Sequence, residues 1–223
     1  MPLPRNPEAI IAELEAGRPV LVLHNYGLPS WPRWHYAVVM GYDADKDVFL
    51  LRSGIERRVE MRTRRFMVAW HYAGRWAMVV LRPGETAANG DAKTYLESAA
   101  DFERGAKPED ARAVFDAAVR RWPAEAVALV GRGTAEYRLG DLHGAARDYA
   151  AALALDAAQI GARNNLAQTL VDLHCPHRAR EQLAAVDVDS LPPPLRDAIL
   201  DTRRLAEAAA SLTGDAAGCP TFP

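Results

Sequence analysis

The second half of the chain repeats a pattern of small and large apolar residues at a period of 34 positions. A small residue is followed four positions later by a large apolar one in each repeat: Ala111 with Phe115, Ala145 with Tyr149, and Ala179 with Leu183. The small residue lets two helices cross closely, and the large one fills the space beside the crossing. The pattern therefore predicts three helix hairpins, at residues 92–125, 126–159 and 160–193.

Proline and glycine positions support these limits. Pro123 closes the first repeat, and Gly140-Asp141 predicts a turn inside the second. The end of a hairpin array needs a helix with a polar outer face, because the last repeat would otherwise expose its apolar side. Residues 194–211 fit that capping helix, since a run of three prolines at 192–194 breaks the chain just before it. We expect residues 212–223 to form a flexible tail.

Residues 1–83 follow a different pattern, a short amphipathic helix and then strand-like runs. Asn6 is a suitable N-cap with Pro7 at the first helical position, and Gly17 ends the helix. Strands are expected at 20–23, 36–40, 48–51, 57–61 and 76–81, with a helix capped by Thr63 before the last of them. The predicted fold is an α+β domain, a linker at 84–91 and an all-α solenoid.

Tyrosine, tryptophan and proline are concentrated in residues 26–34, between the first two predicted strands. Such a loop is stiff, so we expect it to form one wall of a cleft. Arginines gather shortly afterwards, at Arg57, Arg58, Arg62, Arg64 and Arg65, but Glu56 and Glu60 interrupt the run. Because no aromatic stacking pattern accompanies them, a solvated sheet edge is expected rather than a nucleic-acid surface.

Composition narrows the function classes further. The 223 residues are 49% hydrophobic and 25% charged with a net charge of −2, which is typical of a chain with packed cores. No apolar run reaches the ~20 residues of a membrane span, and the start of the sequence does not resemble a signal peptide, so the chain as written is expected in the cytoplasm.

The two cysteines, Cys175 and Cys219, fall in a predicted repeat turn and in the tail, so we expect no disulfide framework. Cys175 also belongs to the run His174-Cys175-Pro176-His177, which holds three potential metal ligands. A zinc site needs a fourth ligand that the sequence does not show. We expect neither a metal nor a cofactor.

The 34-residue pattern resembles the tetratricopeptide repeat, with two departures. Ala157 stands where a closing proline is usual, and Arg163 where the family has a large apolar residue. The resemblance implies a concave groove that binds a protein or an extended peptide. The residues at groove positions are Arg104, Val130, Thr134, Tyr137, Arg138, Asn164 and Gln168. Leu96 and Ala100 replace the family's carboxylate clamp, so a free C-terminal carboxylate is not the expected ligand. The alternative is that these are solvated helix faces.

The run from Trp34 to Asp43, with Gly17 to Val22 before it, resembles the second half of bacteriocin-leader-processing peptidases of the papain-like superfamily, over residues 8–83. The resemblance implies that His35 is the general base of a thiol hydrolase. A thiolate nucleophile and a group that orients the imidazole are also needed. No cysteine precedes His35, and Ser53 stands where the family offers Asp or Asn. Ser53 can bond the ring but cannot stabilise an imidazolium as a carboxylate does.

Two hypotheses explain the missing nucleophile. The chain is part of an active bacterial thiol peptidase whose cysteine lies upstream of residue 1, or it is a degenerate homologue that keeps the scaffold for binding. Under the first, a longer form with an export segment would act in the periplasm or envelope. Without the cysteine-bearing helix, one apolar sheet face would be exposed, and burying a few hundred Å² contributes several kcal/mol at about 25 cal/mol per Å². We therefore expect self-association through the first domain, or a loosely ordered segment 1–83 beside folded repeats.

Overall fold

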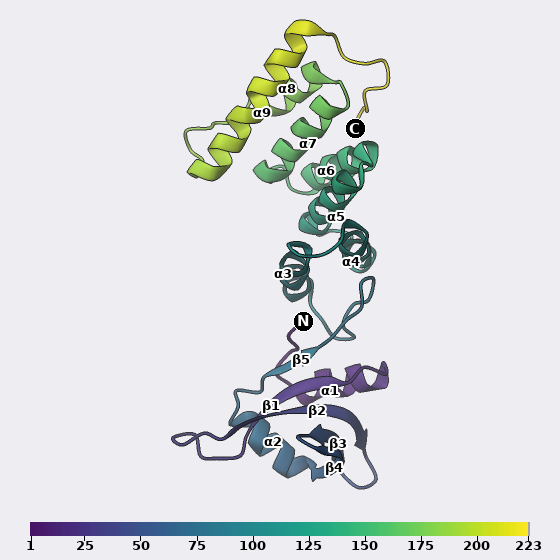
Figure 1. The fold of residues 1–223 in the computed structure, drawn as a ribbon, viewed down its shortest axis with the longest axis vertical. Helices are drawn as coiled ribbons and strands as arrows, with labels where there is room; N and C mark the ends of the chain where they lie inside the picture. Colours follow the sequence, from purple (N-terminus) through teal and green to yellow (C-terminus); the bar gives the residue numbers. More distant parts are fainter. Residues whose placement is uncertain (223) are drawn as a thin grey trace. The chain divides into compact units, whose positions relative to one another are not determined.

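The computed structural model describes residues 1–222 and divides into two compact units, Met1–Ser98 and a second unit that begins at Ala99 (Figure 1). The division falls inside helix α3 (Ala92–Glu103), because the first half of this helix is tied to the preceding segment. Tyr95 in α3 donates its hydroxyl hydrogen bond to the carbonyl oxygen of Glu85. The predicted limits of the linker and of the individual repeats stay predictions.

Helix α1 (Pro7–Glu15) forms where the local signals predict it. The Asn6 side chain accepts a hydrogen bond from the backbone N–H of Ala9 at 2.8 Å, and Pro7 occupies the first turn. Gly17 has a φ of 74°, a left-handed conformation that glycine adopts without steric cost. The helix buries Ile10 completely, and its Glu13 carboxylate is also buried, where it accepts from Arg18 and from the N–H of Ala88.

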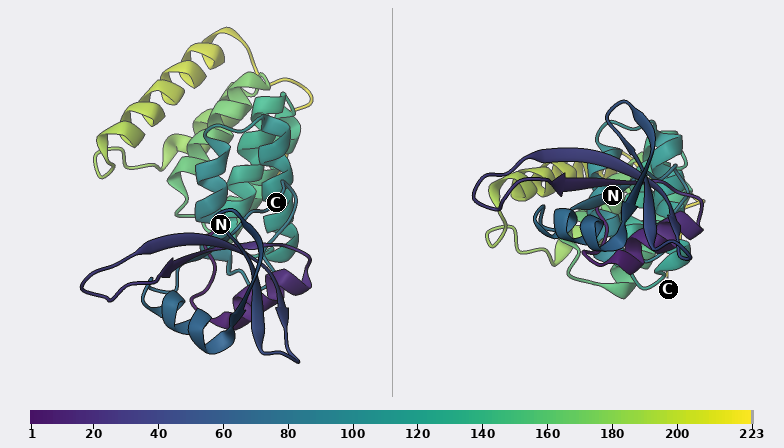
Figure 2. Two further views of the ribbon diagram at one scale, coloured as in Figure 1. Left: turned by 60° about the horizontal axis from the view of Figure 1, so that its bottom comes forward. Right: turned by 90° about the horizontal axis from the view of Figure 1, so that it is seen from below.

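Five antiparallel strands form the sheet of the first unit, in the order β4-β3-β2-β1-β5. Their bounds are β1 (Val20–Asn25), β2 (Trp34–Asp43), β3 (Val48–Ser53), β4 (Glu56–Arg62) and β5 (Ala77–Val79). Residues 1–3 extend the sheet beyond β5, since the N–H of Leu3 donates to the carbonyl of Ala77 and the N–H of Val79 to that of Met1. All five predicted strands are present, and Figure 2 shows the twist of the sheet.

One face of this sheet carries the core of the first unit. Val20 and Val22 pair with Val39 and Ala37, and the four buried side chains share that face because cross-strand partners point the same way. Helix α1 and helix α2 (Thr63–His71) both pack against it, and their Ile10, Phe66 and Trp70 join the same cluster. Phe66 stacks on Phe49 of β3 at 4.1 Å between ring centroids.

The opposite face of the sheet is only partly covered. Alternation along β2 brings Tyr36 and Met40 to this face, and their side chains are 59% and 43% exposed. Leu21, Leu23 and Val38 are half-buried there. The prediction that one apolar sheet face is exposed therefore holds in part, for the outer face, whereas the inner face is covered by α1 and α2.

The Thr63 prediction is wrong in one respect. Thr63 is the first residue of α2 rather than its cap, and Arg62 at the N-cap makes no side-chain capping bond. The Thr63 hydroxyl donates instead to the carbonyl of Asp47, in the turn between β2 and β3. That long-range bond places the start of α2 beside the sheet.

The second unit consists of helix hairpins in sequence order: α4 (Pro108–Arg121), α5 (Ala126–Leu139), α6 (Leu142–Leu155), α7 (Ile160–Asp172) and α8 (Pro176–Ala184). Each helix packs on the next, and α5 also contacts α7. The predicted small residues lie at the crossings: Ala111, Ala145 and Ala179 are fully buried beside Phe115, Tyr149 and Leu183. Gly140, with φ of 82°, ends α5, and the Asp141 side chain caps α6 by accepting from the N–H of Gly144.

Helix α9 (Pro193–Leu212) packs against α7 and α8 and buries Ile199 and Ala206. The chain then turns back towards the hairpins (Figures 1 and 2). Here the expectation that the cysteines form no disulfide is wrong, because Cys175 and Cys219 are bonded with their Cα atoms 5.8 Å apart. The tail at 213–222 is accordingly attached rather than loose: Arg178 donates to the carbonyl of Pro220, and Phe222 packs against the hydrophobic cluster of this unit.

Among residues 1–222, no helix combines the length and the hydrophobicity that crossing a bilayer requires.

Candidate functional site

His35 and Ser53, the predicted general base and its orienting group, are in direct contact. His35 lies near the start of β2 and Ser53 ends β3, and Ser53 Oγ is 2.6 Å from Nε2 of the imidazole. Register explains the contact, because Ser53 pairs with Ala37, two residues after His35, so both side chains point to the core face. The arrangement fixes the orientation of the ring, but a hydroxyl supplies no negative charge to stabilise an imidazolium.

His24 of β1 is a second histidine at this end of the sheet, directly opposite His35 in the strand register. It is completely buried, its ring lies edge-on to Phe66 at 4.8 Å, and its Nδ1 is 3.1 Å from the Tyr26 hydroxyl. Burial, with a further contribution from His35, lowers the pKa of His24 to about 4. Its ring is therefore neutral at physiological pH.

Tyr26 connects the two histidines. Its hydroxyl contacts His24, and its ring lies 5.5 Å from the ring of His35 between centroids. Burial raises the pKa of the Tyr26 phenol, while the charge of Arg65 acts in the opposite direction. Sequence reasoning missed the roles of His24 and Tyr26. The available signal was alternation, because His24 continues the buried positions of Val20 and Val22 and so points to the core face.

The cluster of His24, Tyr26, His35 and Ser53 holds a proton acceptor in a fixed position but no thiol. The only two cysteines of the sequence are in the second unit and are bonded to each other, and Cys175 is fully buried. The cluster can accept or donate hydrogen bonds to a ligand. To act as a thiol hydrolase, the cluster would need a cysteine thiolate as nucleophile, and these residues do not contain one.

Three of the seven predicted peptide-binding residues share one face of the second unit. Tyr137 of α5 donates to Oδ2 of Asp172 at 2.6 Å, and Gln168 of α7 donates to Oδ1 of the same carboxylate at 3.3 Å. Asn164 lies one turn before Gln168 on the same side of α7, and its Oδ1 has no hydrogen-bond partner within residues 1–222. The bond to Asp172 raises the pKa of Tyr137 to about 12, so its phenol stays protonated.

The other four residues take part in the internal structure of the repeats. Thr134 donates to the carbonyl of Val130 and accepts from the hydroxyl of Tyr149. Arg138 donates to the carbonyls of Glu103, the last residue of α3, and of Ala106, and Arg104 just after α3 pairs with Asp101 of that helix. Asp172, which joins Tyr137 to Gln168, was not foreseen. A carboxylate four residues after Gln168 was the available signal, since such a pair faces the same side of a helix.

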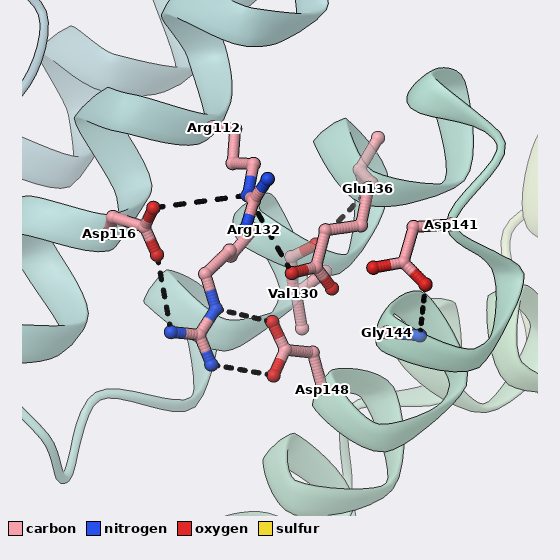
Figure 3. Close-up of polar contacts among 9 residues, drawn as sticks. Arg112, Asp116, Val130, Arg132, Glu136, Asp141, Gly144 and Asp148 are labelled. Atoms are coloured by element: carbon pink, nitrogen blue, oxygen red, sulfur yellow. Dashed lines mark hydrogen bonds and ion pairs between the residues drawn. The ribbon is translucent and has the colours of Figure 1, made fainter.

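A polar network lies on another side of α5, between α4 and α6 (Figure 3). Arg132 makes a two-pronged contact with Asp148 at 2.5 and 2.7 Å and reaches Asp116 at 3.3 Å. Glu136, one turn further along α5, is nearly buried, and its closest cation is Arg112 at 3.9 Å. Burial and the nearby charge of Asp148 raise the pKa of Glu136. The network links consecutive hairpins through charges that the sequence pattern did not reveal.

The sequence matches no family model and no curated protein sequence. Among solved structures, it is similar to the first TPR of Spaghetti (RPAP3) bound to the HSP90 peptide SRMEEVD, with 20% sequence identity and a TM-score of 0.47. The similarity covers 53% of this chain and 95% of the other. The resemblance of residues 8–83 to papain-like peptidases gains no support from these comparisons.

Proposed function

We propose that the second unit binds an extended peptide along the face that α5 and α7 share. The proposal rests on a row of four half-buried side chains, which combine a ring with amide and carboxylate groups: Tyr137, Asp172, Gln168 and Asn164. The bonds through Asp172 fix two of these side chains before a ligand arrives, which lowers the entropic cost of binding. The amide groups of Asn164 and Gln168 suit a peptide backbone, because each peptide N–H and carbonyl needs a hydrogen-bonding partner; Oδ1 of Asn164 is buried without a partner in the described chain, so its amide must reorient to accept from a peptide.

The experiment is a selection with a display library of random dodecapeptides on the full chain and on the double variant Tyr137→Ala/Asn164→Ala. We expect the wild type to enrich a peptide family and the variant to lose at least ten-fold in enrichment. Arg120→Ala/Arg147→Ala is the matched control, because both arginines are exposed on the second helices of their hairpins. Equal enrichment by wild type and double variant, at unchanged helical content, would rule out this face as the binding site.

A second candidate function is favoured by the 2.6 Å contact of His35 with Ser53: a peptidase-like scaffold in the first unit, with His35 at the position of a general base. Because neither cysteine is in this unit, we expect the purified 223-residue chain to show no hydrolysis of a quenched fluorescent peptide mixture. Peptide hydrolysis by the wild-type chain that disappears in His35→Ala would contradict the expectation that the chain is inactive. The scaffold then offers the cluster around His35 for binding rather than for catalysis.

The disulfide bears on the compartment. Bonds such as Cys175–Cys219 form and persist in oxidising surroundings and are rare where glutathione keeps thiols reduced. This observation favours a periplasmic or envelope location over the cytoplasm. Trapping the thiols with a maleimide in intact cells tests it, because modification of Cys175 and Cys219 without prior reduction would argue for the cytoplasm.

A further inference from the structure

The first unit contains a pocket that the proposed functions do not use. It has a volume of about 450 Å³, within the range of small-molecule sites. One wall is the start of the loop after β1, formed by Asn25, Tyr26 and Gly27. The other is the end of β4 together with one side of α2, formed by Arg62, Arg64, Arg65, Val68, Ala69 and Tyr72.

Positive charge concentrates in this pocket, although the charge of Arg62 also acts on Asp47 outside it and helps to lower the pKa of that carboxyl. Within residues 1–222, the guanidinium groups of Arg62, Arg64 and Arg65 form no ion pair, whereas Arg58 of the same basic run pairs with Glu60. The first turn of α2 holds no acidic residue, and its N-cap makes no side-chain bond. Three guanidinium groups beside a helix N-terminus favour an anion, because both supply N–H donors and positive potential.

The loop wall is rigid. Asn25 is almost fully buried, and its Oδ1 accepts from the N–H groups of Gly27 and Arg33 at 2.9 and 2.8 Å. A Cβ atom at Gly27 would lie 2.2 Å from the carbonyl oxygen of Trp31, so the loop closes on itself without room for a side chain there. Of the loop 26–34, which was predicted to form one wall of a cleft, Tyr26 and Gly27 line the pocket.

The remaining lining is apolar or aromatic. Tyr72 and Val68 lie on the α2 side, where they are 40% and 49% exposed, and Tyr26 faces them from the loop. A flat ligand that covers these exposed apolar side chains removes their surface from water, which contributes favourable binding free energy. A hydrated inorganic ion would satisfy the arginines but leave these groups in water.

We propose that this pocket binds a small ligand in which an oxyanion group, a carboxylate or a phosphate, is attached to an aromatic body. The arginines hold the oxyanion, and Tyr26, Val68 and Tyr72 cover the ring. The site is distinct from the peptide-binding face, which lies in the other unit. It uses three members of the basic run that the sequence assigned to a solvated sheet edge, while Arg57 and Arg58 are exposed on the edge strand β4 as predicted.

Isothermal titration of the full chain at fixed ionic strength tests the proposal with three probes: phenyl phosphate, phenylacetate and inorganic phosphate. We expect one of the two aromatic anions to bind at least ten-fold more tightly than inorganic phosphate. The aromatic probe that binds better identifies the oxyanion as phosphate or carboxylate. Inorganic phosphate binding as tightly as both, or no saturation by any probe up to about 10 mM, would overturn the proposal.

Variants locate the site. Arg64→Gln/Arg65→Gln removes two charges but keeps long side chains, and we expect at least a ten-fold loss of affinity for the better probe. Tyr72→Ala should reduce binding of that probe and leave inorganic phosphate unaffected. The matched control is Arg57→Gln/Arg58→Gln, which removes the same charge outside the pocket and should change affinity less than two-fold. An equal loss in both arginine pairs, with hydrogen exchange of α2 unchanged, would show that only net charge attracts the probe.

Discussion

At the scale of single residues, a histidine in the core makes the stability of the first unit depend on pH. His24 lies on the inner face of the sheet with one ring nitrogen bonded to Tyr26 and the other, Nε2, without a partner in the described chain. A buried ring of this kind is stable only when neutral, because a charge there would lose its hydration. Protonation of His24 is therefore coupled to opening of the sheet end that also carries His35.

The first prediction concerns pH. The pKa of His24 is lowered to about 4 in the folded chain from an ordinary 6.5. The folded state therefore has its full stability above pH 6.5, where the ring is neutral in both states, and loses stability as the pH falls towards 4. The shift corresponds to about 3 kcal/mol. We expect amide protection of β1 to fall over this window in the wild type, and the fall to be shallower in His24→Phe. His71→Gln, on the exposed side of α2, is the control and should keep the wild-type profile.

Glu136 gives the second prediction, with the opposite pH dependence. Its pKa is raised in the folded chain, chiefly by burial, so the folded state loses stability as the pH rises from its ordinary 4.5 through the folded value. Glu136→Gln removes this cost. We expect the variant to melt at a higher temperature than the wild type at pH 7 and the difference to shrink towards pH 4.5. A lower melting temperature at pH 7 would show that the contact with Arg112 outweighs the burial.

At the scale of elements, the hairpins depend on glycine as well as alanine at their crossings. Phe115 of α4 packs directly on the backbone of α5 at Gly131, where a Cβ atom would lie 2.2 Å from the ring. Gly133, two residues later, similarly faces Tyr149 of α6 at 3.0 Å. Helix α5 thus receives an aromatic ring from each neighbouring second helix, and the two small residues determine how closely the three helices pack.

The third prediction uses this contact. Gly131→Ala should destabilise the second unit by about 1–3 kcal/mol, because Phe115 is buried and has no space to retreat. Gly161→Ala, in the first turn of α7, is the control: no atom lies within 4 Å of the added Cβ, and alanine favours helix by up to about 1 kcal/mol. Chemical denaturation followed by circular dichroism measures both. Equal stability of the two variants would contradict the packing argument.

Elements specified by neighbouring residues were predictable, and contacts between distant segments were not. Asn6, Pro7 and Gly17 fix α1 by capping and backbone conformation, and the 34-residue period fixes the hairpins through residues that meet within one repeat or between consecutive repeats. Thr63 is a residue type that often caps helices, but its hydroxyl donates to the carbonyl of Asp47, sixteen residues earlier. Among candidate site residues, His35 and Ser53 were found, whereas His24 and Asp172 depend on strand register and on helix packing.

At the scale of the whole molecule, the two units differ in how they are held together. The first relies on a sheet with two helices on one face and contains no cysteine. The second adds the Cys175–Cys219 bond across 44 residues, which joins the start of α8 to the tail after α9. Within this loop the N–H of Ala216 donates to the carbonyl of His174, and the Asp215 side chain accepts from the N–H of His177.

The fourth prediction follows from this difference. In the chain-entropy model, closing a loop across 44 residues contributes about 4 kcal/mol, so Cys175→Ser/Cys219→Ser should lower the stability of the second unit by up to that amount. The first unit is the internal control. Hydrogen exchange resolved by peptide should show faster exchange in α8, α9 and residues 213–222, with β1 to β3 unchanged. Unchanged exchange in α8 and α9 would mean that packing alone holds the tail.

The attachment of the tail also sets an order of events while the chain is being made. Cys175 is synthesised 44 residues before Cys219, which at 5–20 residues per second leaves an interval of roughly 2–9 s. During this time the hairpin of α7 and α8 can form, but its thiol has no intramolecular partner. A small disulfide can exchange with the Cys175 thiolate first and release one thiol, so the yield of correctly bonded chain should depend on how quickly α9 and the tail follow.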